Sequence, residues 1–500
     1  MLMERRTAAT ADILLLLEGT FPYVRGGVSS WVQRIIEGFP DRRFGIIFLG
    51  SARSDYRRSV PYPLPANVDY YAEYFLYDEM DSTAATGTAR SRLDENAIHD
   101  AHLEMKACLK GEGFPRQDSG LAENFGVTRE DFLGSSDVWN YLLQRYVEIP
   151  DQPAFVDYFW TVRSMHAPLW TLEKALRAAP RTKILLAPST GYAGYLGALL
   201  AARLNCPLII SEHGIYTKER RIDLLLARWI HEDEEFLRRP GQIHYLRQLW
   251  IDFFEFLGRF AYQRARRIVN LYGGVIPLQL EGGAVEGKLL TIPNGIDVES
   301  FAPARRPLVQ RQDAVALIGR VVPIKDIKTF IRTADLLRQE GRKTHFWIVG
   351  SSEEDEEYHA ECQVLVEHLG LQDCVHFLGF RSVLEILSAV RLTVLSSISE
   401  GLPLSVLESF AAGVPVVSTD VGACRELLYG AASAEGEAPA GIIVPIADPP
   451  ALAAAIAALL DDEERWSFCS RNAVVRVESQ YQEKQMFERY RRLFEEVSTE

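Results

Sequence analysis

The stretch that decides how the second half of the chain folds runs Ser396-Ser-Ile-Ser-Glu400-Gly-Leu-Pro-Leu-Ser-Val-Leu-Glu408-Ser-Phe-Ala-Ala-Gly413-Val-Pro-Val-Val. A short apolar run ends just before it, and Glu400 then lies in a loop. Pro403 suits the first turn of a helix, where its missing N–H is not needed, and Gly413 is a typical helix stop. The pattern therefore predicts strand, loop, helix and a next strand at Val414–Ser418, as in a parallel α/β sheet.

The start of this helix is predicted to bind an anion. Ligands of open parallel sheets bind at the carboxyl ends of the strands. Free backbone N–H groups near Leu404 and Ser405 would lie there, and the helix dipole would strengthen their attraction for a phosphate. Glu400 comes just before the helix and Glu408 one turn inside it, so both carboxylates could accept hydrogen bonds from sugar hydroxyls. Each glutamate alone would more simply be a helix cap or a surface residue, but the complete string favours a site.

A pair of basic residues follows the first predicted strand of the same half. Arg320 and Lys325 are placed in a strand-to-helix loop, where a planar guanidinium and a point charge could clamp a diphosphate. They would also stabilise a leaving nucleoside diphosphate as its charge develops. A basic pair on a loop is often only a solvated surface, and the nearby carboxylates argue for the functional interpretation.

Short apolar runs alternate with helical patterns along most of the chain, which predicts two facing, Rossmann-like doubly wound α/β domains. The length of 500 residues also exceeds the roughly 250–300 at which one core stops growing. We place the first domain at 1–298 and the second at 299–479, because Pro-Asn-Gly interrupts the pattern near their junction. We expect a mostly helical insertion in the first domain at about 70–170, and a last helix at about 480–500 that packs back on that domain. The predicted strands are Asp12–Leu17, Phe44–Leu49, Lys183–Ala187, Pro207–Ser211, Ile268–Asn270, Ala314–Ile318, His345–Val349, Val375–Leu378, Leu392–Leu395, Val414–Ser418 and Ile442–Val444.

Two loops of the first domain carry further candidates. The loop after the first strand contains Gly26 and Gly27, where no Cβ hinders the approach of a phosphate or an acceptor to the backbone. It lacks the G-x-G-x-x-G fingerprint of dinucleotide-binding proteins, and a plain turn remains an alternative. His213 follows the strand Pro207–Ser211, so we expect it to face the ligand crevice rather than the core. The weaker candidates of this segment are Glu212, Tyr216 and Arg220.

The string S-x-x-E-G-L-P-L-S-x-L-E-x-x-A-x-G-x-P-V resembles family 4 of the glycosyltransferases, which have the GT-B fold. The resemblance implies that Glu400 contacts the donor hexose near the reacting carbon and that Glu408 binds the ribose hydroxyls. It gives Arg320 and Lys325 the diphosphate of the donor. Retention of configuration is implied too, with Glu400 as a ligand of the donor sugar rather than a covalent nucleophile.

The same resemblance extends to other parts of the chain. It implies that His213 bonds a hydroxyl of the donor sugar, and that Gly26 and Gly27 line the cleft opposite the donor. It places Phe380 at the rim that holds the nucleobase. We expect no metal and no other cofactor, because Arg320, Lys325 and the helix start already supply positive charge.

A closer resemblance rests on Leu17–Val32, Tyr158–His166 and Glu212–Arg220. These segments resemble the bacterial family of cytosolic transferases of Pel exopolysaccharide synthesis. The resemblance implies a UDP-sugar donor, with UDP-glucose and UDP-N-acetylhexosamine as the leading options, and a growing saccharide as acceptor. It further implies a cytoplasmic protein that meets the inner membrane through a membrane-embedded synthase and export complex.

Composition excludes some classes. The net charge of −14 argues against a nucleic-acid partner, which would need a basic face. The six cysteines show no metal-ligand spacing and are predicted to be free thiols. No apolar run reaches the roughly 18–20 residues of a membrane span, and the polar start Met1–Ala11 does not resemble a signal peptide.

Two alternatives to sugar transfer stay open. One is a GT-B-like UDP-sugar epimerase that works without an acceptor, and the other is a non-catalytic nucleotide-sugar-binding subunit of a polysaccharide secretion complex. Release of UDP only in the presence of a saccharide would support transfer. Interconversion of donors would support the epimerase, and binding without turnover would support the subunit.

Overall fold

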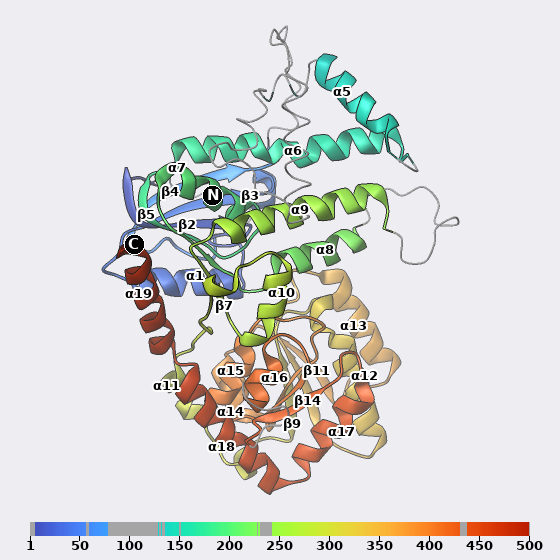
Figure 1. Ribbon diagram of the computed structural model, residues 1–500. Coiled ribbons are helices and arrows are strands. Elements are labelled where there is room, and N and C mark those ends of the chain that lie inside the picture. Colours follow the sequence, from blue (N-terminus) through green and yellow to red (C-terminus); the bar gives the residue numbers. More distant parts are fainter. Residues whose placement is uncertain are drawn as a thin grey trace. The chain divides into compact units, whose positions relative to one another are not determined.

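The computed structural model describes residues 6–56, 60–78, 129, 132, 136–149, 152–227, 229–230, 243–430 and 438–499. The chain divides into two compact units (Figure 1). Unit 1 comprises Met1–Asn270, Ile276–Leu290 and Leu493–Glu500, and unit 2 comprises Leu271–Val275 and Thr291–Arg492. Part of the predicted insertion and Cys108 lie outside the described residues.

The sheet of unit 1 has the strand order β1-β4-β3-β2-β5-β6-β7-β8. The strands are β1 (Arg6–Thr7), β2 (Thr10–Glu18), β3 (Phe44–Gly50), β4 (Val68–Phe75), β5 (Arg181–Ala187), β6 (Leu208–Ser211), β7 (Arg267–Asn270) and β8 (Leu289–Thr291). The pairs from β4 to β7 are parallel, and the short β1 is antiparallel to β4. Residues Ile13–Leu17 of β2 are almost completely buried, as expected for a parallel strand covered on both faces.

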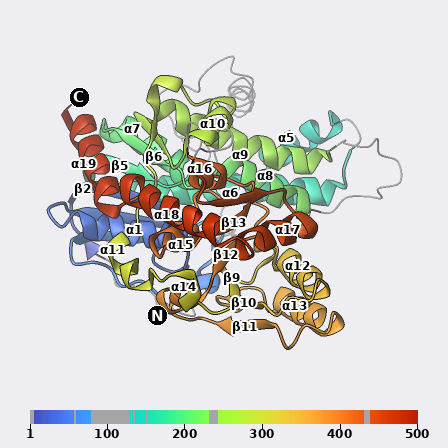
Figure 2. The same cartoon turned by 90° about the horizontal axis from the view of Figure 1, so that it is seen from below.

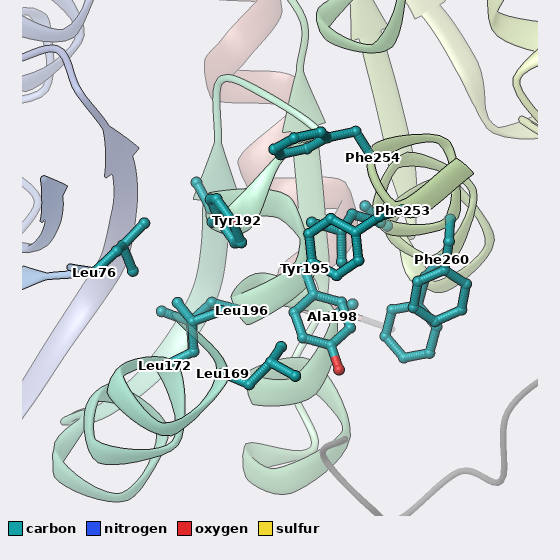
Figure 3. Close-up of a cluster of buried hydrophobic side chains, with 14 of the residues drawn as sticks. Leu76, Leu169, Leu172, Tyr192, Tyr195, Leu196, Ala198, Phe253, Phe254 and Phe260 are labelled. Carbon is teal, nitrogen blue, oxygen red and sulfur yellow. The ribbon is translucent and has the colours of Figure 1, made fainter. Parts of the chain in front are cut away.

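Helices of unit 1 supply most of its core. They are α1 (Gly27–Gly38), α5 (Ser136–Val147), α6 (Phe155–Ala178), α7 (Tyr192–Leu204), α8 (Tyr216–Leu226), α9 (Tyr245–Arg264) and α10 (Ile276–Glu281). Figure 3 shows Tyr195 and Leu196 of α7 among side chains of α6 and α9, including Leu172 and Phe260. The ring centroids of Tyr195 and Phe260 are 5.3 Å apart. This packing fixes α7, whose first residue lies beside the carboxyl end of β2.

Unit 2 contains a six-stranded, entirely parallel sheet in the order β11-β10-β9-β12-β13-β14. Figure 2 shows the strands from β11 to β13 side by side in this order. The strands are β9 (Ala314–Ile318), β10 (His345–Val349), β11 (Val375–Gly379), β12 (Leu392–Leu395), β13 (Val416–Thr419) and β14 (Gly441–Val444). The helices are α11 (Val298–Phe301), α12 (Ile327–Gln339), α13 (Glu356–His368), α14 (Val383–Ala389), α15 (Leu404–Ala411), α16 (Cys424–Tyr429), α17 (Pro449–Leu460), α18 (Glu463–Gln480) and α19 (Glu483–Thr499), which ends in unit 1.

Both sheets share one winding. Counted along the chain from β2 in unit 1 and from β9 in unit 2, six strands of each lie in the order 3-2-1-4-5-6. The chain thus starts in the middle of each sheet, winds to one edge and then returns to wind to the other. Loops after the first and fourth strands leave in opposite directions and open a crevice between them, where ligands of such sheets bind. In unit 1 this switch point lies between β2 and β5, and in unit 2 between β9 and β12.

The structure confirms the predicted strands and adds three that the sequence analysis lacks, the short β1 and β8 and the longer β4. Strand β4 (Val68–Phe75) pairs with β3, although the alternation seemed to end near residue 70. A second difference concerns Pro403, which is the N-cap residue of α15 rather than a member of its first turn. Five of the six cysteines are described, and all five are free thiols. Within the described residues, no helix combines the length and the apolar character that a bilayer span requires.

Candidate functional site

The switch point of unit 2 brings together two predicted residues that are far apart in the sequence. Nζ of Lys325, after β9, lies 2.5 Å from Oε1 of Glu400, after β12. The two side chains are only 17% and 12% exposed, so water screens the pair less than it would screen a surface ion pair. Lys325 and Glu400 thus act together as an ion pair rather than as two separate ligand-binding residues.

Hydrogen bonds join the two loops that carry this ion pair. The Ser397 hydroxyl donates to Oε1 of Glu400 at 2.5 Å. The hydroxyl of Ser396 donates to the carbonyl of Lys325 at 2.8 Å, and the N–H of Ile398 donates to the carbonyl of Ile324 at 2.9 Å. These bonds fix the position of both charges before any ligand arrives.

Gly422, after β13, supports the Glu400 loop from another side. The N–H of its neighbour Ala423 donates to the carbonyl of Gly401 at 2.8 Å. Gly422 has a φ of +52°, and a Cβ there would lie 2.3 Å from the carbonyl oxygens of both Glu400 and Gly401. Only glycine fits this approach, because it has no Cβ and tolerates positive φ.

The start of α15 has the properties of an anion site. Its N-cap, Pro403, makes no side-chain hydrogen bond to the helix, as expected because proline has no acceptor in its side chain. Leu404 and Ser405 in the first turn are half-buried, and the Ser405 carbonyl accepts a 2.7 Å bond from the Ser409 hydroxyl. Glu408 follows one turn later and is also half-buried. The helix therefore offers its dipole and first-turn amides to a ligand.

Two further predicted residues of unit 2 lie on exposed parts of the loops. Arg320 forms an ion pair with Glu354, and neither side chain is buried. Phe380 follows Gly379, whose φ is +63°, and its side chain is 83% exposed. A phenyl ring so exposed is available to a planar ligand.

In unit 1, the predicted residues lie on the loops after β2 and β6. Gly26 is the N-cap residue of α1, and a Cβ on either Gly26 or Gly27 would meet no atom within 4 Å. The ring of His213 packs edge-on against Trp31, with 4.5 Å between the ring centroids. Nε2 of His213 is buried and has no hydrogen-bond partner among the described residues. Burial lowers the pKa of His213 to about 3, so its imidazole is neutral at neutral pH.

Two buried carboxylates of unit 1 hold the segment around His213. Glu18, the last residue of β2, accepts hydrogen bonds from the Tyr216 hydroxyl at 2.8 Å and from the N–H of Ala193 at 3.2 Å. Glu212 accepts from Nε2 of Gln279 at 3.0 Å. Burial raises the pKa of both carboxyl groups, although their hydrogen bonds act in the opposite direction.

Glu18 was absent from the sequence-based candidates, although its place at the end of a strand could have indicated it. The weaker candidates Tyr216 and Arg220 join it in one cluster, since Nη2 of Arg220 donates to the Tyr216 hydroxyl at 3.1 Å. No group of three or more His, Cys, Asp or Glu residues in the described part of the chain is arranged to hold a metal ion.

Comparisons with known proteins agree with this architecture. Residues 11–287 match the family described as domain of unknown function DUF3492, and residues 312–462 match the family described as glycosyl transferases group 1. The structure is similar to that of Anabaena HepE in complex with UDP, with a TM-score of 0.59, 13% identity, and coverage of 97% of this chain and 100% of that chain. It is also similar to sucrose-phosphate synthase from Thermosynechococcus elongatus, with a TM-score of 0.59, 15% identity, and coverage of 97% and 99%. These likenesses confirm the predicted GT-B fold.

The alignments with curated relatives cover only part of each relative's length. An MMP α-(1→4)-mannosyltransferase of Mycolicibacterium hassiacum is 25% identical over 268 residues, which are 53% of this chain and 59% of the relative. A D-inositol 3-phosphate glycosyltransferase of Kineococcus radiotolerans is 31% identical over 218 residues, 40% of this chain and 48% of the relative. The chain thus covers less than two thirds of either relative. Together with the family matches, these findings show that the chain belongs to the DUF3492 family and carries a domain of the glycosyl transferases group 1 at residues 312–462.

Proposed function

We propose that the protein is a retaining sugar transferase that takes a hexose from a UDP-sugar and passes it to a growing saccharide. The observation that carries the proposal is the Lys325–Glu400 ion pair at the switch point of unit 2. It lies in the crevice where doubly wound sheets bind their ligands. A cation and a carboxylate suit the two halves of a nucleotide sugar, since the diphosphate needs positive charge and the sugar hydroxyls need acceptors.

Donor binding would rearrange this ion pair rather than fill an empty site. The diphosphate would take over part of the interaction of Lys325, and a hydroxyl of the hexose would donate to Glu400. Negative charge on the leaving diphosphate increases toward the transition state, so Lys325 would stabilise that state more than the bound donor. Glu400 would remain a ligand of the sugar, because its oxygen is already bonded to Lys325 and Ser397.

Other residues of unit 2 would bind the rest of the donor. The start of α15, with Leu404 and Ser405, would receive a phosphate, and Glu408 would accept hydrogen bonds from the ribose. Phe380 would contact the base, and Arg320 would exchange its partner Glu354 for the diphosphate. No metal is needed in this scheme, because the positive charge comes from side chains and the helix dipole.

Unit 1 would supply the acceptor side. His213 is neutral, since burial lowers its pKa to about 3, and a neutral imidazole can share a hydrogen bond with a sugar hydroxyl without adding charge. Gly26 and Gly27 leave open space at the start of α1, which would admit an acceptor. The first domain of the sequence analysis would thus bind the acceptor and the second the donor.

The wider role that we propose is in Pel exopolysaccharide synthesis. It is supported by the resemblance of Leu17–Val32, Tyr158–His166 and Glu212–Arg220 to the PelF transferases. A cytoplasmic transferase of this kind would work with a membrane-embedded synthase and export complex. UDP-glucose and UDP-N-acetylhexosamines are the donors to be tested first.

The test is an assay of UDP release from a panel of UDP-sugars, with and without oligosaccharide acceptors, followed by NMR of the anomeric configuration of the product. We expect acceptor-dependent release and an α-linked product from an α-configured donor. The variant Lys325→Met should lose most of the turnover. Lys328→Met is a matched control, because Lys328 of α12 pairs with Glu361 of α13 rather than with Glu400. Interconversion of donors without acceptor, or binding without turnover, would refute transfer.

A further inference from the structure

The switch point of unit 1 carries unsatisfied polar atoms. The Thr20 hydroxyl lies just after β2, and the Ser189 hydroxyl just after β5. Both oxygens are buried, and neither has a hydrogen-bond partner among the described residues. The same holds for Nε2 of His213, just after β6. Buried polar atoms are nearly always paired because leaving one unpaired is costly, so three at neighbouring strand ends are suited to hydrogen-bond a ligand.

The register of the strands brings these positions together. Strand β5 pairs with both β2 and β6, so the three strands are consecutive in the sheet. Leu15 of β2 is opposite Leu186, and Ala187 is opposite Ile210 of β6. Because neighbouring strands are about 4.8 Å apart, the loops that follow them span roughly 10 Å, which is the scale of one sugar ring with its hydroxyls.

The surroundings of these atoms are rigid. Gly191, between Ser189 and α7, packs so closely that a Cβ there would lie 2.6 Å from the Tyr216 hydroxyl and 2.7 Å from Oε2 of Glu18. Glu18 in turn bonds the Tyr216 hydroxyl and the N–H of Ala193. On the other side, Trp31 packs against the His213 ring. The backbone beside Ser189 and the ring of His213 are therefore held in place.

The charged groups around the site indicate which kind of ligand it can bind. Glu18 and Glu212 are carboxylates next to this edge, and protein groups already donate hydrogen bonds to both of them. Arg220 donates to the Tyr216 hydroxyl and lies over the Phe254 ring, so its charge is used within the protein. What remains for a ligand is two hydroxyls and a neutral imidazole, which can both donate and accept hydrogen bonds. Such a set fits an uncharged polyol, and none of these three groups carries a positive charge to balance a phosphate or a carboxylate.

We propose that Thr20 and Ser189, next to His213, bind the hydroxyl groups of an uncharged sugar unit of the acceptor. The proposal rests on the function proposed above and specifies its acceptor, since unit 1 is the unit proposed to bind it. Thr20 and Ser189 would select acceptors by hydrogen bonding, because a hydroxyl pair that stays unsatisfied with the wrong ligand penalises its binding.

The experiment compares Thr20→Val and Ser189→Ala with the wild type in the full-length protein. Saturation-transfer NMR in the presence of saturating UDP measures the binding of chitotriose and maltotriose as uncharged probes and of trigalacturonate as an anionic one. Each variant should weaken the binding of the uncharged probe by about three- to tenfold, as expected for the loss of one hydrogen bond. Affinity for UDP should not change, and Tm should stay the same or rise, because neither hydroxyl has a partner in the protein.

A matched control lies at the other end of β5. The Thr182 hydroxyl donates to the carbonyl of Ile184 at 3.0 Å, so Thr182→Val should lower Tm and leave saccharide binding unchanged. Unchanged saccharide affinity in Thr20→Val and Ser189→Ala would overturn the proposal. It would also be overturned if the wild type bound no uncharged probe or bound trigalacturonate more tightly. Saccharide binding that depends on both hydroxyls, without consumption of any UDP-sugar, would instead refute the transferase function and leave the subsite standing.

Discussion

Substituting Gly422 by alanine tests whether the Glu400 loop is held as the structure indicates. Gly422 has a φ of +52°, and a Cβ there would come within 2.3 Å of two carbonyl oxygens, those of Glu400 and Gly401. Neither oxygen belongs to a flexible side chain, so the backbone loop itself must move. The loop also carries the carboxylate that binds Lys325, and a shift should therefore affect stability and donor binding together.

The expected magnitude has three parts. An alanine in the left-handed region costs about 1–2 kcal/mol, and forcing the loop aside costs about 1–3 kcal/mol more. Replacing glycine also removes entropy from the unfolded chain, which returns about 0.4–1 kcal/mol. The net loss for Gly422→Ala is about 2–4 kcal/mol, which should lower Tm by roughly 5–15 °C in a domain of this size.

Gly341→Ala separates the two costs. Gly341 follows α12 with a φ of +85°, and a Cβ there would meet no atom within 4 Å. This variant keeps the backbone cost without the clash, so its Tm should fall by only roughly 2–4 °C. Differential scanning fluorimetry gives both values, and calorimetric titration with UDP should show weaker binding for Gly422→Ala alone. Equal Tm losses, or normal UDP affinity in Gly422→Ala, would refute the inferred contact.

Three further outcomes follow from the described contacts. Lys325→Met should lower kcat by roughly 100- to 1000-fold, far more than it weakens the binding of the UDP-sugar. Single-turnover kinetics measures the first effect and calorimetry the second. Equal losses in rate and affinity would argue against a role of Lys325 at the leaving group. Glu408→Ala should weaken UDP binding by about 1.5–3 kcal/mol through the loss of a charged acceptor for the ribose, and an unchanged calorimetric Kd would contradict that role. The pKa of His213 is lowered to about 3 in the folded state, against an unfolded value of about 6.5, so only the unfolded chain gains a proton as the pH falls below 6.5. Stability should then decrease by up to about 1.4 kcal/mol per pH unit toward pH 3, and this dependence should be smaller in His213→Gln; parallel Tm changes of both proteins between pH 7.5 and 5.0 would disprove it.

The strands of unit 2 were predictable because helices cover both faces of its sheet. Each strand is then a short apolar run, such as Ala314–Ile318 or Leu392–Leu395, between residues typical of turns. Strand β4 of unit 1 was not predicted because Asp69 and Glu73 interrupt its apolar residues without a regular alternation. Its Glu73 accepts a 2.8 Å bond from the Tyr71 hydroxyl and another from Tyr23, and this carboxylate depends on partners that no local pattern reveals.

The residues of the site were predictable, but their pairing was not. Glu400 and Lys325 stand out in the sequence because each follows a buried strand and precedes a helix. Their ion pair depends on the position of β9 beside β12, which is a property of strand order and not of either segment. The unpaired hydroxyls of Thr20 and Ser189 could not be predicted from the sequence for the same reason, because their burial without a hydrogen-bond partner arises only in the folded chain.

Under the proposed function, the two switch points would explain how the same strand order can serve two substrates. In both units the first strand lies in the middle of the sheet, and the following strands fill first one edge and then the other. Each sheet therefore has its ligand crevice between the first and fourth strands. In unit 2 the crevice holds an ion pair of one cation and one carboxylate, which a charged diphosphate can enter by exchange. In unit 1 the carboxylate at the corresponding strand end, Glu18, is bonded by the protein itself, and the atoms left over are uncharged. Under the proposed function, a charged leaving group and an uncharged acceptor would therefore bind at separate switch points, because the same topology ends in different side chains.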